Sequence, residues 1–463
     1  MSDGLTRRAF LGNSGRTAAG LAAGLSMSTL LREANGVAAN ERFTVALIGC
    51  GGMGRYKLNN FIDTKQCDVS AVCDVDEEQM NKAAEDVQKK LGREAARIRD
   101  YRKVLDRKDI DLVIIGTPDH WHAAPMIAAV AVGKDVYCEK PCCHNIREGR
   151  AMVDAAKKFN RIVQVGTHQR SMPHIQAARE FVQAGKLGTI SMTNTYTYGN
   201  DSPDGLGHGP DSDPPAGVDY DAWLGPAPVR PFNKRRFHSS WRWYFDYGCG
   251  MVGDWNVHLQ DIIMWSMGAV RPVSVATSGG KWILTDDRDT PDVMQAVYEF
   301  GSAPNAPKGF VQTYTMRKVS GRPWSADGYG MDLHGTNGFM HLTRKEWKLE
   351  ADRKDWNDPK SEFRTESFNK RDDGADVAAH MAHVENFLAC VRSREAPIAS
   401  IDKHYNTVVA CHLANVSLRV GRKIYWDGDK ELCFKDRELT TPDADANKLL
   451  EREYRKGYGL PQV

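Results

Sequence analysis

The sequence predicts an α/β protein whose first part folds as a doubly wound parallel sheet. Short apolar runs alternate with helical patterns from residue 43 onward, which is typical of strand–helix–strand units around such a sheet. The first run ends in a glycine-rich turn at residues 49–54. The composition is that of an ordinary globular chain, since 41% of the 463 residues are hydrophobic and 26% are charged. This length predicts two or three domains.

The charge balance argues against two broad classes of protein. The 62 basic and 60 acidic side chains give a net charge of +2, and no long basic run suggests binding to nucleic acid. No charge-free apolar stretch of about 18 residues, the length of a membrane-spanning helix, appears in the body of the chain. We therefore expect neither a nucleic-acid partner nor an integral membrane protein.

The pattern of the first 39 residues predicts a targeting signal and not a folded element. Residues 6–12 read TRRAFLG, and small and apolar residues follow from Thr17 to Leu31 without a charge. Paired arginines before a weakly hydrophobic run are typical of a twin-arginine export signal. We therefore expect contact with the twin-arginine translocase, cleavage that leaves Asn40 near the mature end, and a periplasmic or secreted protein. The alternative is a cytoplasmic protein with a helical N-terminal extension.

The ten cysteines do not require disulfides. A twin-arginine substrate folds in the reducing cytoplasm before it crosses the membrane. Cys142 and Cys143 are adjacent, and no two CxxC pairs have the spacing of a zinc site. We expect most of these residues to be buried free thiols.

A dinucleotide-binding motif is predicted at the first strand. Residues 43–49 read FTVALIG and lead into GCGGMG, in which Gly49, Gly51 and Gly54 fit the three glycines of the fingerprint. They provide a tight turn, close approach of the backbone to a pyrophosphate, and close helix packing. The motif alone is weak, but the next strand ends in Asp74, 20 residues past Gly54. A carboxylate there binds the ribose hydroxyls and repels a 2′-phosphate, so NAD is favoured over NADP.

The alternation then continues to about residue 167. Further helices are expected at 76–91, at 101–107, from the end of TPDHWH (117–122) to residue 132, and at 146–159. Further strands are expected at 111–116, 135–138 and 161–166. We expect six strands before residue 167, which complete a doubly wound sheet. The loops at the carboxyl ends of the strands should converge on the cofactor crevice, and they lie at 49–54, 74–76, 117–122, 139–141 and 167–170.

A second group of polar residues follows a long irregular stretch. Residues 199–250 are rich in Gly, Pro, Asp and Trp, and such loops are uncommon unless they shape a binding site. The next segment reads as a helix with Asp254 and His258 four residues apart on one face. His258 is the general-base candidate because an imidazole titrates near neutrality, and Asp254 orients it or binds a substrate hydroxyl. Asp261 is expected to be structural, and metal ligation by these three residues is the alternative.

Five motifs together resemble the glucose–fructose oxidoreductase, inositol dehydrogenase and rhizopine-catabolism family, Gfo/Idh/MocA. They are GCGGMG, Asp74, TPDHWH at 117–122, EKP at 139–141 and DWNVH at 254–258. The resemblance covers about residues 43 to 427 and implies a Rossmann domain at 40–167. It also implies an α/β domain at 168–427, whose large, mostly antiparallel sheet has an open face that often makes oligomer contacts. A homo-oligomer, either a dimer or a tetramer, is therefore expected.

The resemblance also implies which residues meet NAD. They are Gly49, Gly51, Gly52, Met53, Gly54, Asp74, Thr117, Pro118, Asp119, His120, Trp121, His122, Glu139, Lys140 and His168. Two of them depart from the family, because Asp119 replaces the usual asparagine of TPN and His168 replaces an asparagine after the sixth strand.

Lys140, with His258 and Asp254, forms the implied catalytic group. Oxidation of a secondary alcohol needs a base for the hydroxyl proton, and a positive charge beside the alcohol stabilises the developing alkoxide. A lysine at the mouth of the sheet, followed by a turn-fixing proline, suits that role. The alternative is an ordinary surface lysine in a turn.

The expected substrate is a carbohydrate or a cyclic polyol. Aromatic faces stack on a pyranose, and charged side chains bind its hydroxyls. The candidates for these contacts are Arg170, Trp223, Arg242, Tyr244, Tyr247, Asp254 and His258. Some aromatic side chains of 199–250 must instead fill the core of the second domain. His380 and His383 lack a third ligand nearby in sequence and are expected on the surface or in packing, so no metal is expected.

The sequence is compatible with three functions. Export favours an oxidoreductase that keeps and recycles its NAD, because no substantial pool of free NAD is expected outside the cytoplasm. An NAD-dependent glycosidase, as found among members of the family, would oxidise a ring hydroxyl, eliminate the glycosidic group, add water and return the hydride. The third function is a non-catalytic nucleotide-binding regulator or scaffold, which the intact Lys140, Asp254 and His258 disfavour. Residues 428–463 read as a tail that wraps a neighbouring subunit or extends into solvent.

Overall fold

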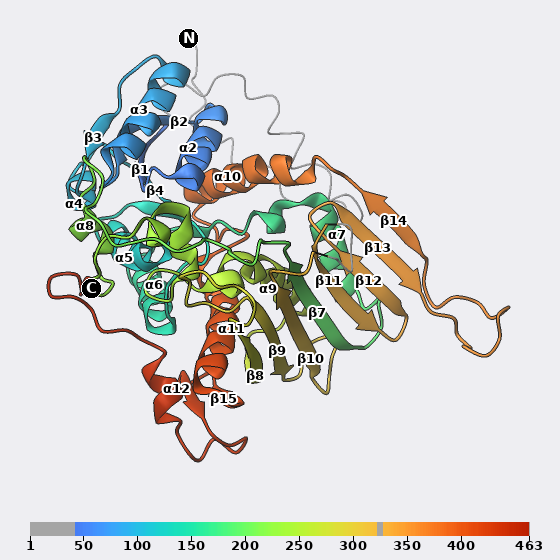
Figure 1. Cartoon of the computed structure of the whole chain (residues 1–463). Coiled ribbons are helices and arrows are strands. Elements are labelled where there is room, and N and C mark those ends of the chain that lie inside the picture. The colour runs from blue at the N-terminus through green and yellow to red at the C-terminus, as the bar shows by residue number, and fades with distance from the viewer. Residues whose placement is uncertain (1–41, 322–326, 463) are drawn as a thin grey trace, which may run out of the picture. The chain divides into compact units, whose positions relative to one another are not determined.

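The first sheet of the computed structural model is the expected doubly wound Rossmann sheet. The structure describes residues 42–321 and 327–462, so the expected export signal at 1–39 lies outside the described residues. Its six parallel strands run in the order β3-β2-β1-β4-β5-β6 (Figure 1). They are β1 (Phe43–Ile48), β2 (Cys67–Cys73), β3 (Ala96–Ile98), β4 (Leu112–Ile115), β5 (Asp135–Cys138) and β6 (Val163–Val165).

Five helices connect these strands, and capping residues mark the ends of the helix α3. They are α2 (Gly52–Asp63), α3 (Glu77–Leu91), α4 (Tyr101–Leu105), α5 (Ala123–Ala131) and α6 (Ile146–Lys158). Asp76 caps α3 by accepting the backbone N–H of Glu78, and Gly92 ends it in the left-handed conformation. The expected helix ranges are confirmed. The sequence does not predict the edge strand β3, because its three residues are not fully buried and show no apolar run.

The second sheet has ten strands and is mostly antiparallel, as the family resemblance implies. Its order is β14-β13-β12-β11-β7-β10-β9-β8-β15-β16, and β7 and β10 form a parallel pair within it. The strands are β7 (Ile190–Tyr198), β8 (Pro272–Gly280), β9 (Val293–Phe300), β10 (Phe310–Arg317), β11 (Tyr329–Gly335), β12 (Gly338–Leu342), β13 (Glu346–Ala351), β14 (Phe368–Arg371), β15 (Ile424–Asp427) and β16 (Leu432–Phe434).

Helices from the second half of the chain close the core around both sheets. They are α7 (Pro173–Gln183), α8 (Tyr220–Leu224), α9 (Val257–Met267), α10 (Ala375–Ser393), α11 (Ile401–Val420) and α12 (Ala444–Lys448). Helix α10 lies beside α2 (Figure 1) and buries Phe387 among the apolar residues of the first sheet. Helix α11 packs on α6, α9 and β8, so one apolar core runs from the first sheet to the second. His380 and His383 on α10 are both buried, which agrees with a packing position and not a surface one.

The segment after residue 427 does not extend into solvent. Strand β16 adds to the second sheet, and Leu450 is buried. Arg452 donates to the backbone oxygen of His120 over 2.8 Å and pairs with Glu148, so the last segment returns to the Rossmann domain of the same chain. Its packing on its own chain corrects the expectation of a solvated tail.

The ten cysteines all lie within the described residues, and every one of them is a free, buried thiol. This agrees with the expectation of a fold that does not depend on disulfides. Among the described residues, no helix combines the length and apolarity needed to cross a bilayer.

Candidate active site

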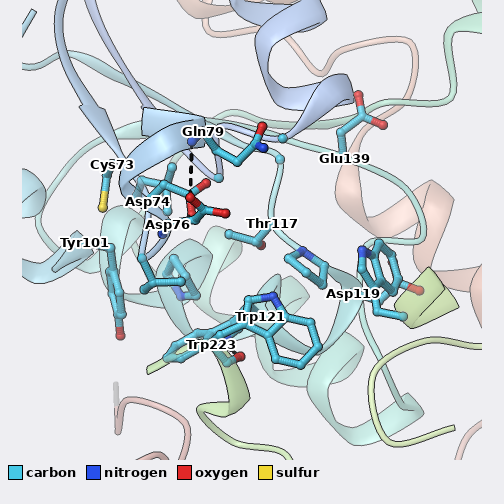
Figure 2. Close-up of a pocket in the computed structure, with 18 of the residues that line it drawn as sticks. Cys73, Asp74, Asp76, Gln79, Tyr101, Thr117, Asp119, Trp121, Glu139 and Trp223 are labelled. Atoms are coloured by element: carbon cyan, nitrogen blue, oxygen red, sulfur yellow. Dashed lines mark hydrogen bonds between the residues drawn. The ribbon is translucent and has the colours of Figure 1, made fainter. Parts of the chain in front are cut away.

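A pocket of about 720 Å³ opens at the carboxyl ends of the parallel strands (Figure 2). Ligands of open α/β sheets bind at this edge. Four of the five expected loops meet there, but residues 167–170 do not line the pocket. The expected cofactor residues that line it are Gly49, Gly51, Gly52, Met53, Asp74, Thr117, Pro118, Asp119, Trp121, Glu139 and Lys140.

The glycine loop forms a cradle that side chains would fill. Gly49 has φ +90°, which favours glycine, and a Cβ on Gly54 would stand 1.9 Å from the Gly49 oxygen. Gly51 and Gly52 instead line the pocket and have nothing within 4 Å of a would-be Cβ. Gly51 begins α2 without a side-chain cap. The free N–H groups of this helix end suit an anionic pyrophosphate, so the cradle fits a dinucleotide.

Asp74 is held at the nucleotide end of this pocket by the backbone. Its two oxygens accept the N–H groups of Cys50, at 2.6 Å, and Asp76, at 2.9 Å. Burial raises the pKa of Asp74 to about 6. In Figure 2, Asp74 and Asp76 lie together at one end of the pocket and Asp119 at the other, with Thr117 between them. The backbone therefore fixes the Asp74 carboxylate in the lining of the pocket.

Aromatic side chains form the outer wall of the pocket. The Trp121 indole N–H donates to the backbone oxygen of Trp223 over 2.9 Å. The Trp121 ring meets the edges of Tyr101 and Tyr458, with ring centroids 5.9 and 5.8 Å apart. Sequence reasoning missed Tyr101 and Tyr458, because Tyr101 was assigned only to a short helix and Tyr458 lies in the last segment of the chain.

The opposite end of the pocket holds three charged side chains from three segments. Lys140 Nζ donates to the backbone oxygen of Asp254 over 2.7 Å and to its Oδ1 over 3.1 Å. Arg242 Nε donates to the same Oδ1 over 2.9 Å. Burial opposes ionisation of Asp254, but Lys140 and Arg242 outweigh it and lower the pKa of Asp254 to about 2. Asp254 is therefore an ionised carboxylate that fixes both cations.

The backbone around Asp254 is a wide π-helical turn, Val252–Asn256, that runs directly into α9. Such turns are rare and occur often at functional sites. Gly253 lies in this turn, where a Cβ would stand 2.4 Å from the Cβ of Cys249. The sequence predicted a helix here, but not that its first turn is widened.

His258 and His168 are not among the residues that line the pocket. The His258 ring lies 5.5 Å from that of His168, and His168 stacks on His380 at 3.6 Å. His168 Nε2 lies 2.8 Å from the Asp376 carboxylate. Burial lowers the pKa of His258 well below its usual value, so its imidazole is neutral. Helix α10 supplies His380 and Asp376, which both contact His168.

His120 and His122 also lie behind the pocket and hold its loops. His120 Nε2 lies 3.0 Å from the backbone oxygen of Trp223. The two ring nitrogens of His122 lie 2.7 Å from the oxygen of Pro141 and 2.9 Å from that of Thr117. Neither is among the residues that line the pocket.

Of the expected substrate contacts, Trp223, Arg242 and Asp254 line the pocket, whereas Arg170, Tyr244 and Tyr247 do not. The Arg170 guanidinium makes two hydrogen bonds, of 2.7 and 2.8 Å, to the buried Asp261. Tyr244 and Tyr247 belong to an apolar cluster around Trp223. The sequence could not separate these core residues from pocket residues, since both kinds are aromatic or charged.

The described residues hold one candidate metal group, His168, Asp376 and His380. Lys57 Nζ lies 2.6 Å from His380 Nδ1, and Arg344 lies 3.5 Å from the Asp376 carboxylate. Two cations and two stacked imidazoles do not suit a further cation, because imidazole lone pairs lie in the ring plane. The alternative of metal ligation by Asp254, His258 and Asp261 fails because both carboxylates are paired with side-chain cations.

Models of one protein family match both halves of this architecture. The model described as "Oxidoreductase family, NAD-binding Rossmann fold" matches residues 43–167. The model described as "Oxidoreductase family, C-terminal alpha/beta domain" matches residues 176–283.

Curated relatives match shorter stretches. The chain is 39% identical over 98 residues to levoglucosan dehydrogenase of Pseudarthrobacter phenanthrenivorans, covering 21% of this chain and 25% of that protein. It is 25% identical over 161 residues to rhizopine catabolism protein MocA of Rhizobium meliloti, covering 34% and 47%. It is 30% identical over 168 residues to a glycosyl hydrolase family 109 protein of Saccharopolyspora erythraea, covering 34% and 37%. The chain thus spans about a quarter to a half of the length of these relatives.

Solved structures share most of the fold at low identity. Levoglucosan dehydrogenase in complex with NADH and levoglucosan superposes with a TM-score of 0.63 and 19% identity, over 83% of this chain and 99% of that chain. Aldose-aldose oxidoreductase from Caulobacter crescentus, complexed with glycerol, gives a TM-score of 0.61 and 16% identity, over 83% and 99%.

Proposed function

This chain belongs to the Gfo/Idh/MocA oxidoreductase family, and from that premise we propose that it is an NAD-dependent oxidoreductase of a secondary hydroxyl. The proposed substrate class is a sugar, a glycoside or a cyclic polyol. The observation that carries the proposal is the Lys140 ammonium, which is fixed by Asp254 in the same pocket that the glycine cradle opens.

Both backbone groups and side chains would hold NAD. Gly51 and Gly52 leave room for its pyrophosphate beside the first N–H groups of α2, and Asp74 accepts from its adenosine ribose. When bound, NAD supplies the acceptor for the hydrogen and two electrons that leave the substrate carbon.

Lys140 is positioned to stabilise negative charge on the substrate oxygen. An ammonium has three donors, and two of them are used by the backbone oxygen and Oδ1 of Asp254. The remaining N–H can donate to the oxygen of a bound alcohol, which becomes more basic as the carbon is oxidised. Arg242 fixes the same carboxylate, so the ammonium is oriented before substrate binds.

The lining of this end supports a hydroxylated ring as substrate. Trp223, Trp241 and Arg242 all line the pocket, and the Arg242 guanidinium lies 4.4 Å from the centre of the Trp241 ring. Stacking faces beside fixed donors suit a molecule with an apolar face and hydroxyl edges. The names of two relatives, levoglucosan dehydrogenase and scyllo-inositol 2-dehydrogenase, support the same class.

We also propose that the protein is exported by the twin-arginine route with NAD held and recycled in the pocket. The free state of all ten cysteines is compatible with folding in a reducing compartment. Residues Trp223, His238 and Trp241 from the long loop and Tyr458 from the last segment wall the outer side of the pocket. A walled pocket would slow the loss of cofactor.

The experiment that tests the function begins with the purified full chain. Mass spectrometry of the denatured protein should find NAD or NADH, and a panel of sugars, glycosides and polyols should change the absorbance at the NADH band. A protein that carries and binds no nicotinamide nucleotide, and changes no spectrum with any substrate, would contradict the proposal.

A second candidate, an NAD-dependent glycosidase, is favoured by the similarity to the glycosyl hydrolase family 109 protein. This activity would release an aryl group from aryl glycosides without added NAD and without net oxidation. Binding of NAD with neither signal would favour the remaining alternative, a nucleotide-binding regulator or scaffold.

A further inference from the structure

The last segment of the chain returns to the rim of the pocket. It leaves α12 and ends beside α8 (Figure 1), and Tyr458 lines the same pocket as Trp121 and Trp223. The Tyr458 ring meets that of Trp121 edge-on, with ring centroids 5.8 Å apart. Tyr458 lies outside the ranges that the two family models match. This part of the rim is therefore a feature of this chain's own last segment.

A buried carboxylate anchors the start of this segment. Arg452 Nη2 lies 2.5 Å from Glu148 Oε1, and the Tyr454 hydroxyl donates to the same oxygen over 3.0 Å. The Glu148 side chain is 0% exposed, so water has little access to this anchor. Arg452 Nη2 also donates to the backbone oxygen of His120. The chain is thus firmly held as far as Tyr454.

An exposed carboxylate holds the residues that follow. Asp221 on α8 accepts from the Arg455 guanidinium and, over 3.1 Å, from the Tyr458 hydroxyl. Its side chain is 67% exposed, and ion pairs at such positions are weak because water and salt screen them. Gly457 and Gly459 are exposed, and no atom lies within 4 Å of a would-be Cβ on either. Residues 455–462 can therefore detach from α8 while the anchor at Glu148 holds.

We propose that residues 455–462 form a strap that closes the nucleotide pocket, with Asp221 as its latch, and that release of this latch limits both the entry and the exit of NAD. Asp221 lies on the same short helix as Ala222 and Trp223, which line the pocket, so the latch joins the strap directly to the pocket wall. Opening of such a segment often sets the rate at which a bound molecule leaves. The inference rests on the proposed function, since it requires NAD in this pocket.

The test measures the entry and exit of NADH in the purified full chain by stopped-flow fluorescence. Mixing nucleotide-free protein with NADH gives the entry rate, and mixing the NADH complex with excess NAD gives the exit rate. Asp221→Ala should raise both rates by about 5- to 30-fold, as expected for the loss of one exposed ion pair and one hydrogen bond. The matched control is Asp109→Ala, at the exposed pair with Arg107, and it should keep both rates.

Two further measurements separate the latch from other effects. Tyr458→Phe keeps the ring at the rim but loses the hydroxyl that bonds Asp221, and it should raise both rates by about 2- to 10-fold. The ratio of the Asp221→Ala rates to the wild-type rates should shrink from low to high sodium chloride. Salt weakens the Arg455–Asp221 pair of the wild type, whereas the variant has no such pair to lose.

The outcomes distinguish this inference from the proposed function. Faster exit with unchanged entry would make Asp221 and Tyr458 ordinary supports of the bound nucleotide and would overturn the strap. Wild-type rates in Asp221→Ala would overturn it as well, while the uptake of NADH would leave the proposed function standing. A chain that takes up no NADH would contradict the proposed function itself, and the strap would fail with it.

Discussion

Asp254 and Asp261 lie seven residues apart on one continuous helical segment, and each binds a cation from the first half of the chain. Asp254 pairs with Lys140 at the pocket, where the side chains are 12% and 18% exposed. Asp261 pairs with Arg170, where the side chains are 3% and 0% exposed. The two pairs have the same chemistry but differ in access.

The exposure of each ion pair to the pocket decides whether it can bind a ligand. The Arg170–Asp261 pair has its remaining bonds filled by Thr407 and by the backbone oxygen of Ile398, so nothing is left for a ligand. The Lys140–Asp254 pair keeps an ammonium donor beside open space. Gly54 and Gly51 differ in the same way. Gly54 packs against the Gly49 oxygen, whereas Gly51 faces the pocket.

The sharpest test of this contrast is Lys140→Ala. Removing the ammonium should lower kcat/KM by about 1,000-fold or more, because a fixed charge at a developing oxyanion contributes about 3–4 kcal/mol and the orientation of Asp254 is lost as well. The free energy of unfolding should fall less than in a variant that breaks the Arg170–Asp261 pair, since Arg242 still pairs with Asp254. Steady-state kinetics and urea denaturation measure both. Wild-type turnover in this variant would remove Lys140 from the mechanism.

Asp261→Asn should have the opposite effect. It leaves the buried Arg170 charge without its partner, which should lower the free energy of unfolding by about 3–5 kcal/mol. The fraction that remains folded should keep most of its activity per molecule. Asp109→Asn, at an exposed pair with Arg107, is the control and should cost less than about 1 kcal/mol. Equal stabilities of the two variants in urea would contradict a structural role for Asp261.

Gly54 and Gly51 allow the same comparison of a packed and a pocket-facing position within the glycine loop. Gly54→Ala places a methyl group against the Gly49 oxygen and should cost about 1–3 kcal/mol of stability. Gly51→Ala meets no atom within 4 Å and should keep its stability, but the methyl group should hinder a pyrophosphate and weaken NADH binding by about 10- to 100-fold. Thermal denaturation and NADH fluorescence titration separate the two effects. Tight binding by Gly51→Ala would show that the cradle does not hold the nucleotide.

The Rossmann half could be predicted from the sequence almost completely, because its rules are local. The glycine motif, the strand that ends in Asp74 and the helix caps all depend on residues within about one strand–helix–strand unit. The exception is β3, whose three partly exposed residues carry no pattern.

The end of the pocket that holds Lys140 and Asp254 was only partly predictable. Its lining depends on which side chains are covered by the second half of the chain. Lys140 and Asp254 lie where expected. His168 and His258 are both buried, and His168 contacts α10, whose position no local pattern gives. Asp119 was expected to contact the cofactor, and it lines the pocket.

Asp74→Asn carries the smallest expected effect and tests how a pocket-facing carboxylate responds to pH. Because burial raises the pKa of Asp74 from 3.8 to about 6, the folded protein binds this proton more tightly than the unfolded chain does. The group therefore lowers stability progressively as pH rises from about 4 to about 6, and the full cost remains above that range. Asp74→Asn should remove this slope.

Nucleotide binding should show the opposite pH dependence. The ionised carboxylate is the stronger acceptor for ribose hydroxyls, so NADH affinity of the wild type should increase through pH 6, where Asp74 ionises. In Asp74→Asn the affinity should be about 10-fold lower at pH 8, as expected for the loss of a charge-assisted hydrogen bond, and should not change through this range. Calorimetric titrations at pH 5 and pH 8 make the comparison. Asp254 serves as the internal contrast, because Lys140 and Arg242 hold its pKa near 2 and it stays ionised at both pH values. A wild-type affinity that is the same at both would mean that Asp74 does not bind the ribose.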